Sequence, residues 1–160
     1  MTGSLTANEA QPTAHAVQGT PVVPGVGYGP AIRPAPRPSR PDTAVEIAED
    51  ARDAEKERFR AAAAEVGRRL QARAALATGS ASEVLAANAA MAEDRGWIGA
   101  GVKAIGKGSD AAFAAVTATD QFVAMFAKLG GRMAERITDL MDICDRVIAE
   151  LSDLPEPGVP

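Results

Sequence analysis

The sequence predicts a mainly α-helical protein. We expect a four-helix-bundle-like subdomain of antiparallel helical hairpins, preceded by one strand of an otherwise absent α/β domain. Three observations predict this fold. All 11 prolines lie in the first 41 residues or the last six, so residues 42–154 contain none of these helix breakers. The same stretch is rich in alanine, a strong helix former, and poor in aromatic residues. Residues 130–154 repeat apolar side chains at three- and four-residue spacing, the pattern of an amphipathic helix.

The most regular segment is residues 130–154, which two glycines open and a proline follows. Its apolar stripe, about 120° wide, consists of Met133, Ile137, Leu140, Met141, Cys144, Val147, Ile148 and Leu151. We expect this stripe to pack on other helices, with Asp142 and Asp145 on the solvated side. Cys144 is interpreted as a small core residue, with a reactive thiol as the alternative.

Turn residues divide the rest of the proline-free stretch. Helices are predicted over residues 42–77, over residues 81–94 and from Ser109 onwards. The glycine-rich residues 95–108 are expected to be broken, with a short helix between turns. The first helix is expected to bury Val45, Ala48, Phe59, Ala62, Ala63, Val66 and Leu70. The helix after Ser109 is expected to pack through Phe113, Val116, Phe122, Val123, Phe126 and Leu129.

The flanking segments differ in composition from this helical stretch. Residues 1–16 are small and polar without periodicity, which predicts a disordered tail. Residues 17–33 alternate valines and other apolar residues with glycines and are predicted to form a strand, which needs a partner sheet. Residues 34–41 are predicted to be a proline-rich linker, with a peptide ligand of an SH3-type domain as the alternative. Residues 42–154 form the helical subdomain, and residues 155–160 are a proline-rich end.

Charge and composition exclude several classes of function. The net charge is −4, and the acidic excess lies in the helical stretch, which argues against a nucleic-acid partner. No apolar run reaches the roughly 20 residues that span a bilayer, and the start does not resemble a secretory signal. We therefore expect a cytoplasmic protein without membrane insertion. A single cysteine allows neither an intramolecular disulfide nor a cysteine-based metal cluster.

No catalytic constellation is present in the sequence. His15, the only histidine, lies in the polar tail without a neighbouring group that would activate it. If the chain acts by itself, it acts by binding. Trp97 and Ile98 form an apolar pair in what reads as a glycine-flanked turn. Trp97 either closes the end of the core or is an exposed anchor for a partner, since tryptophan is enriched at binding hot spots.

Three segments together resemble a known family. Residues 22–32 (VVPGVGYGPAI), 83–94 (EVLAANAAMAED) and 133–151 (MAERITDLMDICDRVIAEL) occur in the order and spacing of enzyme I of the phosphoenolpyruvate–sugar phosphotransferase system, in an actinobacterial-type form. In this family the first segment is the opening strand, and the last helix carries an Arg-x-x-Asp-[Leu/Val]-x-Asp-[Ile/Val]-x-x-Arg signature. Here that signature runs from Arg136 to Arg146. The last helix is the most specific of the three.

The resemblance implies that this chain is one part of a larger enzyme of sugar transport, in which separate domains bind HPr and transfer the phosphoryl group. In this family a histidine on an α/β domain takes a phosphoryl group from phosphoenolpyruvate and passes it to the phosphocarrier protein HPr. A helical subdomain inserted after the first strand docks HPr. The phosphohistidine motif is expected after residue 160, and the barrel that binds phosphoenolpyruvate and Mg²⁺ is a further domain. This segment is therefore expected to bind HPr without catalysing transfer, to hold no cofactor itself and to be monomeric.

The resemblance also implies which residues meet HPr. They lie at the end of the second helix, in the turn after it and in the first half of the last helix. Here these residues are Asn88, Met91, Asp94, Arg95, Trp97, Ile98, Arg132 and Arg136. Asn88 replaces a more common His or Gln, and the turn that begins at Arg95 lacks an acid that the family often has. These departures weaken the expected attraction to basic residues of HPr.

Two other interpretations remain open from the sequence. The residues from Trp97 to Gly99 satisfy the W-x-G turn of small secreted helical-hairpin proteins, which have no preceding strand motif. A purely structural helical bundle is the third possibility. The strand motif and the last helix favour the enzyme I interpretation, because they are more specific than a three-residue turn.

Overall fold

The computed structural model describes residues 18–20, 24–30 and 32–159. The chain divides into two units, Met1–Ala31 and Ile32–Pro160. All of the helices described belong to the second unit. None of them is long and apolar enough to cross a membrane.

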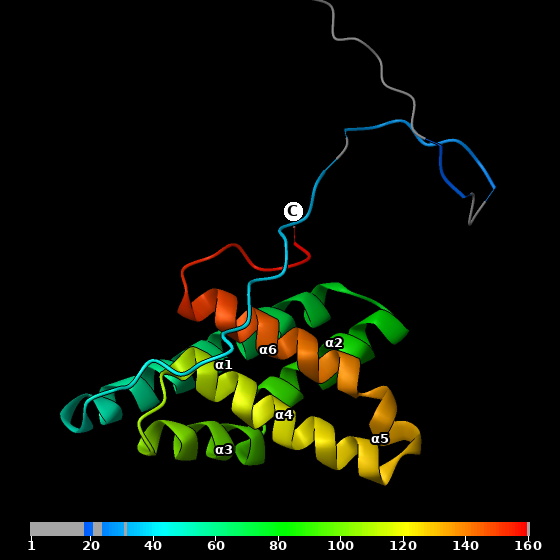
Figure 1. Ribbon diagram of the computed structural model, residues 1–160. Coiled ribbons are helices and arrows are strands. Elements are labelled where there is room, and N and C mark those ends of the chain that lie inside the picture. The colour runs from blue at the N-terminus through cyan, green and yellow to red at the C-terminus, as the bar shows by residue number, and fades with distance from the viewer. Residues whose placement is uncertain (1–17, 21–23, 31, 160) are drawn as a thin grey trace, which may run out of the picture. The chain divides into compact units, whose positions relative to one another are not determined.

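The second unit is mainly α-helical (Figure 1). A short 3₁₀ turn and six α-helices follow one another: η1 (Glu49–Ala51), α1 (Arg52–Leu76), α2 (Ser80–Ala92), α3 (Arg95–Gly106), α4 (Ala111–Leu129), α5 (Gly131–Glu135) and α6 (Ile137–Leu151). The longer helices α1, α2, α4 and α6 pack as an antiparallel bundle, with α3 against α1 and α4. The predicted four-helix-bundle-like architecture is thus confirmed for these helices.

The expected strand over residues 17–33 is not formed in the part of it that the structure describes. Residues 17, 21–23 and 31 of this range lie outside the described residues. Val26 and Tyr28 are fully exposed and have no strand beside them. A lone strand has no partner for its backbone groups, so an extended segment of this composition needs a sheet supplied from elsewhere.

The first helix begins later than predicted. Residues 42–48 run extended and pair with the turn that precedes α4: Ile47 N donates to the Gly108 carbonyl at 2.8 Å, and Asp110 N donates to the Val45 carbonyl at 3.1 Å. These contacts take the backbone groups that a helix would use internally. Val45 and Ala48 are consequently exposed, contrary to the prediction, and α1 starts only at Arg52.

Residues 95–106 form one helix, and a turn follows at residues 107–108. The expected short helix between turns is thus confirmed, whereas the expected break inside the glycine-rich segment was wrong. Asp94 caps it, because its Oδ1 accepts a hydrogen bond from Trp97 N at 2.9 Å. The glycines let α3 approach α1 closely. A Cβ on Gly101 would lie 2.4 Å from the ring of Phe59, which packs against the Trp97 ring with centroids 5.4 Å apart.

The core of the bundle is built largely from alanine on α4 and from larger side chains on α1 and α6. Ala111, Ala114, Ala115 and Ala118 are fully buried, whereas Leu129 is 64% exposed, contrary to the prediction. Phe59, Ala62, Ala63, Val66 and Leu70 of the first helix are buried as predicted. Small side chains on α4 therefore bring its neighbours close. Of its larger residues, Phe126 is buried as predicted, and Val116, Phe122 and Val123 are half-buried against the core.

The last segment is divided into α5 and α6 at Arg136, where Arg136 N bonds the Met133 carbonyl in a tighter turn. The predicted stripe is otherwise confirmed, since Leu140, Cys144, Val147, Ile148 and Leu151 are all buried. Ile143, Asp145 and Ala149 are buried too. The helix α6 is therefore covered on more than one side, which a single stripe does not predict.

We expect Gly101→Ala to lower the free energy of unfolding by about 1–3 kcal/mol, the usual cost of forcing an extra methyl group into a packed core. The reason is the Cβ position 2.4 Å from the Phe59 ring. Urea unfolding followed by the fluorescence of Trp97, the only tryptophan, measures the change.

Gly99→Ala is the matched control on the same helix. A Cβ at Gly99 would meet no atom within 4 Å. This variant should be neutral or more stable by up to about 1 kcal/mol, the difference in helix propensity between the two residues. Equal stability of the two alanine variants would contradict the close approach of α3 to α1.

Candidate functional site

An apolar groove of about 430 Å³ lies where α2, α4 and the start of α6 meet. Each helix presents one face at helical spacing, so the groove follows from three separate periodic patterns. The lining residues are Ala87, Ala90 and Met91 on α2; Phe122, Met125 and Phe126 on α4; Met133, Arg136 and Leu140 on the last segment; and Asp94 with Trp97 at the start of α3.

Trp97 forms part of the floor of this groove and is completely buried. Its Nε1 donates a hydrogen bond to Thr119 Oγ1 at 3.1 Å, which satisfies the polar atom of the indole inside the core. The residue lies in the first turn of α3 rather than in an open turn. The structure therefore supports the interpretation that Trp97 closes the end of the core, and not the interpretation that it is an exposed anchor.

Charged groups border the groove at two places. Asp94 stands at the α3 end, where it also caps that helix. Arg136 stands at the α6 end, and its guanidinium lies 3.8 Å from Asp139 in a loose, part-exposed ion pair. Such a pair contributes little to stability, so Arg136 remains available to another acidic group.

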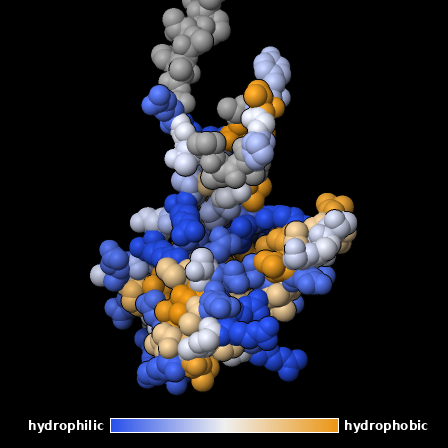
Figure 2. Space-filling model, turned by 90° about the vertical axis from the view of Figure 1, so that its right-hand side faces the viewer, coloured by the Kyte–Doolittle hydropathy of each residue, from blue (hydrophilic) through white to orange (hydrophobic). Residues whose placement is uncertain are grey.

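A second hollow adjoins the groove along α2 and α5. Its lining residues are Glu83, Val84, Ala87, Arg132, Met133, Glu135, Arg136 and Asp139. Four of them, Glu83, Val84, Arg132 and Glu135, are exposed. Figure 2 shows the side of the molecule on which α5 lies in Figure 1, where hydrophobic patches are separated by hydrophilic side chains. The groove and this hollow share Ala87, Met133 and Arg136, so they form one continuous surface.

The structure brings together five of the eight residues singled out in the sequence. Met91, Asp94, Trp97 and Arg136 line the groove, and Arg132 lines the adjoining hollow. The other three, Asn88, Arg95 and Ile98, line neither hollow. Asn88 Oδ1 is buried without a hydrogen-bond partner, Arg95 is exposed at the start of α3, and Ile98 packs against the core.

Sequence reasoning missed the contribution of α4. Its prediction that Phe122 and Phe126 pack on the core is confirmed, but it overlooked Met125, which is 43% exposed beside the groove. The signal was present, because the segment has two apolar faces. One is made of alanines and the other of Phe and Met, so a helix that packs through its alanines leaves part of the second face at the surface.

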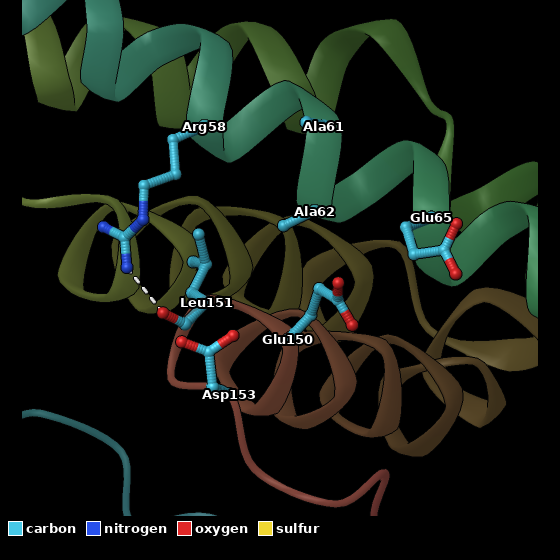
Figure 3. Close-up of a pocket in the computed structure, with 7 residues that line it drawn as sticks. All are labelled: Arg58, Ala61, Ala62, Glu65, Glu150, Leu151 and Asp153. Atoms are coloured by element: carbon cyan, nitrogen blue, oxygen red, sulfur yellow. Dashed lines mark hydrogen bonds between the residues drawn. The ribbon is translucent and has the colours of Figure 1, made fainter.

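Another hollow, of about 500 Å³, lies between α1 and the end of α6 (Figure 3). Arg58 reaches across it and donates a hydrogen bond to the carbonyl of Leu151. Glu65 and Glu150 also line it, and Arg69 bonds both of them at 2.8 Å. Most of its charged groups thus hold α1 against α6, so we assign it no ligand.

The proline-rich residues 34–41, which we call the strap, pack against α6. Arg40 Nε donates to Asp145 Oδ1 at 2.6 Å, and Arg40 Nη2 donates to the Met141 carbonyl at 3.0 Å. Asp145 is only 2% exposed, so the expectation that it is solvated was wrong. The strap arginine supplies the counter-charge that a buried carboxylate needs. The interaction also holds the pKa of Arg40 above its usual value.

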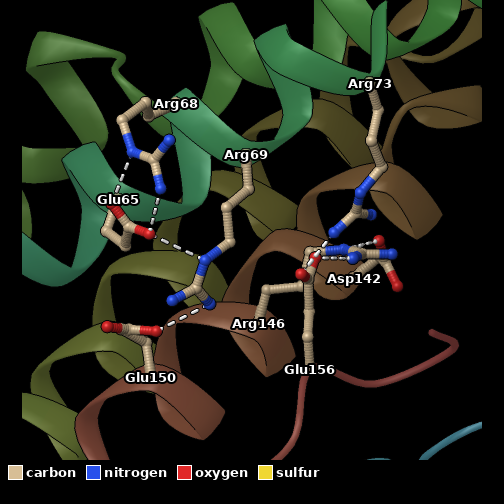
Figure 4. A network of polar contacts seen from close by, with 8 residues as sticks. All are labelled: Glu65, Arg68, Arg69, Arg73, Asp142, Arg146, Glu150 and Glu156. Atoms are coloured by element: carbon tan, nitrogen blue, oxygen red, sulfur yellow. Dashed lines mark hydrogen bonds and ion pairs between the residues drawn. The ribbon is translucent and has the colours of Figure 1, made fainter. Parts of the chain in front are cut away.

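The end of the chain is fixed beside the strap. Ala35 exchanges two backbone hydrogen bonds with it, to the Val159 carbonyl and from Gly158 N, both at 3.0 Å. Pro157 is fully buried. Glu156 accepts from both Arg73 on α1 and Arg146 on α6, and Arg146 also binds Asp142 (Figure 4). The segments that enter and leave the bundle therefore lie side by side, as Figure 1 also shows.

In the described part of the chain, no group of three or more His, Cys, Asp or Glu side chains is placed to hold a metal ion. Cys144 is free and completely buried. Burial raises the pKa of its thiol to about 11, although a hydrogen bond with Thr119 acts in the opposite direction. Cys144 is therefore a core residue, as the sequence predicted, and not a nucleophile.

These features define a helical bundle with an apolar, charge-bordered groove. Residues 18–136 match the family described as PEP-utilising enzyme, N-terminal, and the chain belongs to this family. It is similar to the phosphoenolpyruvate-protein phosphotransferase of Streptomyces coelicolor, with 40% identity over 112 residues. The matched region covers 69% of this chain and 20% of that relative, so the chain spans about a fifth of its length.

Two solved structures share the fold. One is the solution structure of an Enzyme I protein, with a TM-score of 0.61 and 23% identity over 77% of this chain and 53% of that chain. The other is the N-terminal domain of Enzyme 1-Nitrogen, with a TM-score of 0.60 and 24% identity over 69% of this chain and 48% of that chain. Together with the family match, they confirm the resemblance to the N-terminal domain of enzyme I.

The ion pairs of Glu156 make stability depend on pH. Burial disfavours its charged form, but Arg73 and Arg146 outweigh this and lower the pKa of Glu156 below its usual value. A carboxylate with a lowered folded-state pKa stabilises the fold above its unfolded-state pKa, and that contribution is lost as the pH falls through the folded-state pKa. We expect Glu156→Gln to be less stable than the parent at pH 7 and to lose less stability between about pH 5 and 3.

Urea titrations at several pH values test this expectation. Asp153→Asn is the control, because Asp153 is exposed, and asparagine tolerates its left-handed backbone with φ of 51°. Parallel stability curves for Glu156→Gln and the parent would contradict the role assigned to the Glu156 network.

We expect the thiol of Cys144 to be unreactive in the folded chain. With a pKa of about 11, only about one thiol in a thousand is ionised at pH 8, and burial blocks access to it. A chromogenic disulfide reagent should react slowly in buffer and at once in urea. Rapid labelling of the folded chain would show that Cys144 is accessible.

Proposed function

We propose that this chain is the part of an enzyme I, a phosphoenolpyruvate–protein phosphotransferase, that docks the phosphocarrier HPr. The observation that carries the proposal is a convergence. Residues chosen for docking from the family pattern, Met91, Asp94, Trp97 and Arg136, line one apolar groove although they lie on three helices. The family match over residues 18–136 supports the same conclusion.

The groove suits a protein surface that carries apolar side chains with charges around them. Methionine is flexible and polarisable, so Met91, Met125 and Met133 can adapt to a partner's apolar side chains. Arg132 and Arg136 can meet acidic groups at one border, and Asp94 can meet a basic group at the other. Trp97 acts as a rigid floor under this surface. The groove gives the partner an apolar centre and a polar rim, the usual anatomy of a protein interface.

The remaining parts of the chain fit a role inside a larger enzyme. We propose that residues 17–33 complete a sheet of an α/β phosphohistidine domain and that residues 1–16 are a tail. In this proposal the phosphoryl group passes to HPr from a histidine of that domain, and phosphoenolpyruvate and Mg²⁺ bind in a further domain of the parent enzyme. The groove residues position HPr and take no part in the chemical step. The segment itself is a cytoplasmic monomer in this proposal.

Neither alternative from the sequence has a supporting observation. The residues from Trp97 to Gly99 lie within α3 and do not join two helices of a hairpin, as a W-x-G turn would. A purely structural role does not explain why Met125 and Val84 are exposed beside a groove. Apolar side chains on a surface contribute more when a partner covers them.

We expect Arg136→Glu to weaken HPr binding by about tenfold, which corresponds to about 1.4 kcal/mol, and to leave the helical content unchanged. The charge of Arg136 borders the groove, and its only ion pair in the described residues is the loose one with Asp139. Titration of the isotope-labelled chain with HPr, followed by NMR, measures the affinity and should shift the Trp97 and Arg136 signals.

Lys107→Glu is the control, because it makes the same charge change at an exposed residue on the far end of α3, in a different hollow. Equal weakening by both variants would indicate a general charge effect and not a groove contact. An unperturbed spectrum of the parent chain at millimolar HPr would refute the proposed function.

A further inference from the structure

The first part of α6 is engaged on two faces at once. On one face, Leu140 and the preceding Arg136 line the groove. On another face, the Met141 carbonyl and the Asp145 carboxylate receive the hydrogen bonds of Arg40 from the strap. Any change in the position of this part of α6 therefore affects the groove and the strap together.

Arg40 makes the shortest polar contacts between the strap and α6 among the described residues. It bonds Met141 and Asp145, which are one turn apart, and so grips the helix at two successive positions. Arg37 also faces Asp145, but at 3.8 Å and with a side chain that is 67% exposed. The polar contact thus depends on one side chain, 105 residues away from Asp145 in the sequence.

The start of α6 also has a place where it can move. The helix is interrupted at Arg136 between α5 and α6, and two glycines with positive φ, Gly130 and Gly131, precede α5. A small change in backbone angles at these positions would let α6 shift relative to α4 without breaking a continuous helix. Such a shift would displace Leu140 from the groove lining.

We propose that the strap regulates the docking groove. When Arg40 bonds Asp145 and Met141, α6 is held in the position in which Leu140 and Arg136 complete the groove. When the strap is released, α6 can shift and the lining of the groove changes. The strap continues directly into residues 32–33 of the same unit. Because the two events are thermodynamically linked, binding of a partner in the groove also favours the state in which the strap is bound to α6. Only the identity of the partner rests on the proposed function; the coupling within the chain does not.

The test uses methionine methyl signals of the full chain, with and without HPr. Met91, Met125 and Met133 report on the groove directly. Arg40→Met removes the grip, and we expect shifted methyl signals at these residues without HPr and at least fivefold weaker HPr binding. Arg37→Met is the matched control in the same strap, and it should leave both readouts unchanged because its contact is long and exposed.

Because Arg40→Met leaves the buried Asp145 with only its long contact to Arg37, it can also destabilise the whole bundle. The double variant Arg40→Met with Asp145→Leu removes both charges and should keep the helical content. If the grip positions α6, the groove methyl signals shift in the double variant as well. Groove signals in the double variant that coincide with those of the parent chain would overturn the proposal.

The measurements with HPr distinguish this proposal from the proposed function. Shifted groove signals in both Arg40 variants, together with no HPr binding by the parent chain, would support the coupling and refute the docking of HPr. If the parent and both Arg40 variants bind HPr equally tightly and the groove signals do not shift, the result would support docking and refute the coupling.

Discussion

A buried carboxylate on α6 sets the arrangement of this molecule. Asp145 is almost completely removed from water, and an unpaired ion in that position costs several kcal/mol. Arg40 meets this requirement from a segment that lies before the first helix. The strap consequently becomes part of the bundle, and the start and the end of the described helical unit lie side by side. This ion pair thus holds the strap on α6, and the backbone hydrogen bonds of Ala35 hold the strap beside residues 158–159.

Packing of small side chains has a second, related effect. Fully buried alanines on α4 and Gly101 on α3 bring neighbouring helices close together. The larger apolar side chains of α4, such as Phe122 and Met125, then lie toward the surface and line the groove with those of α2 and α6. The features that make the core compact are therefore the same ones that place adaptable side chains where a partner can reach them.

The helix α6 combines both roles. Its buried face holds the bundle, its first turn borders the groove, and its strap face receives Arg40. The N-terminal family match ends at residue 136, where α5 meets α6. Function and stability are consequently linked in this helix, because side chains that position the groove are one turn away from side chains that hold the fold.

The sequence by itself determined the helical class, the buried stripe of the last helix, the core role of Cys144 and the family. These follow from periodicity within one segment and from motif order, which a linear pattern contains. Only the tertiary structure decided that Asp145 is buried, that Trp97 lies beneath the groove and that α4 contributes Met125. It also decided that residues 42–48 remain extended. Each of these depends on a partner far away in the chain. Local periodicity shows which side of a helix is apolar but not which distant charge or backbone group will meet the other side.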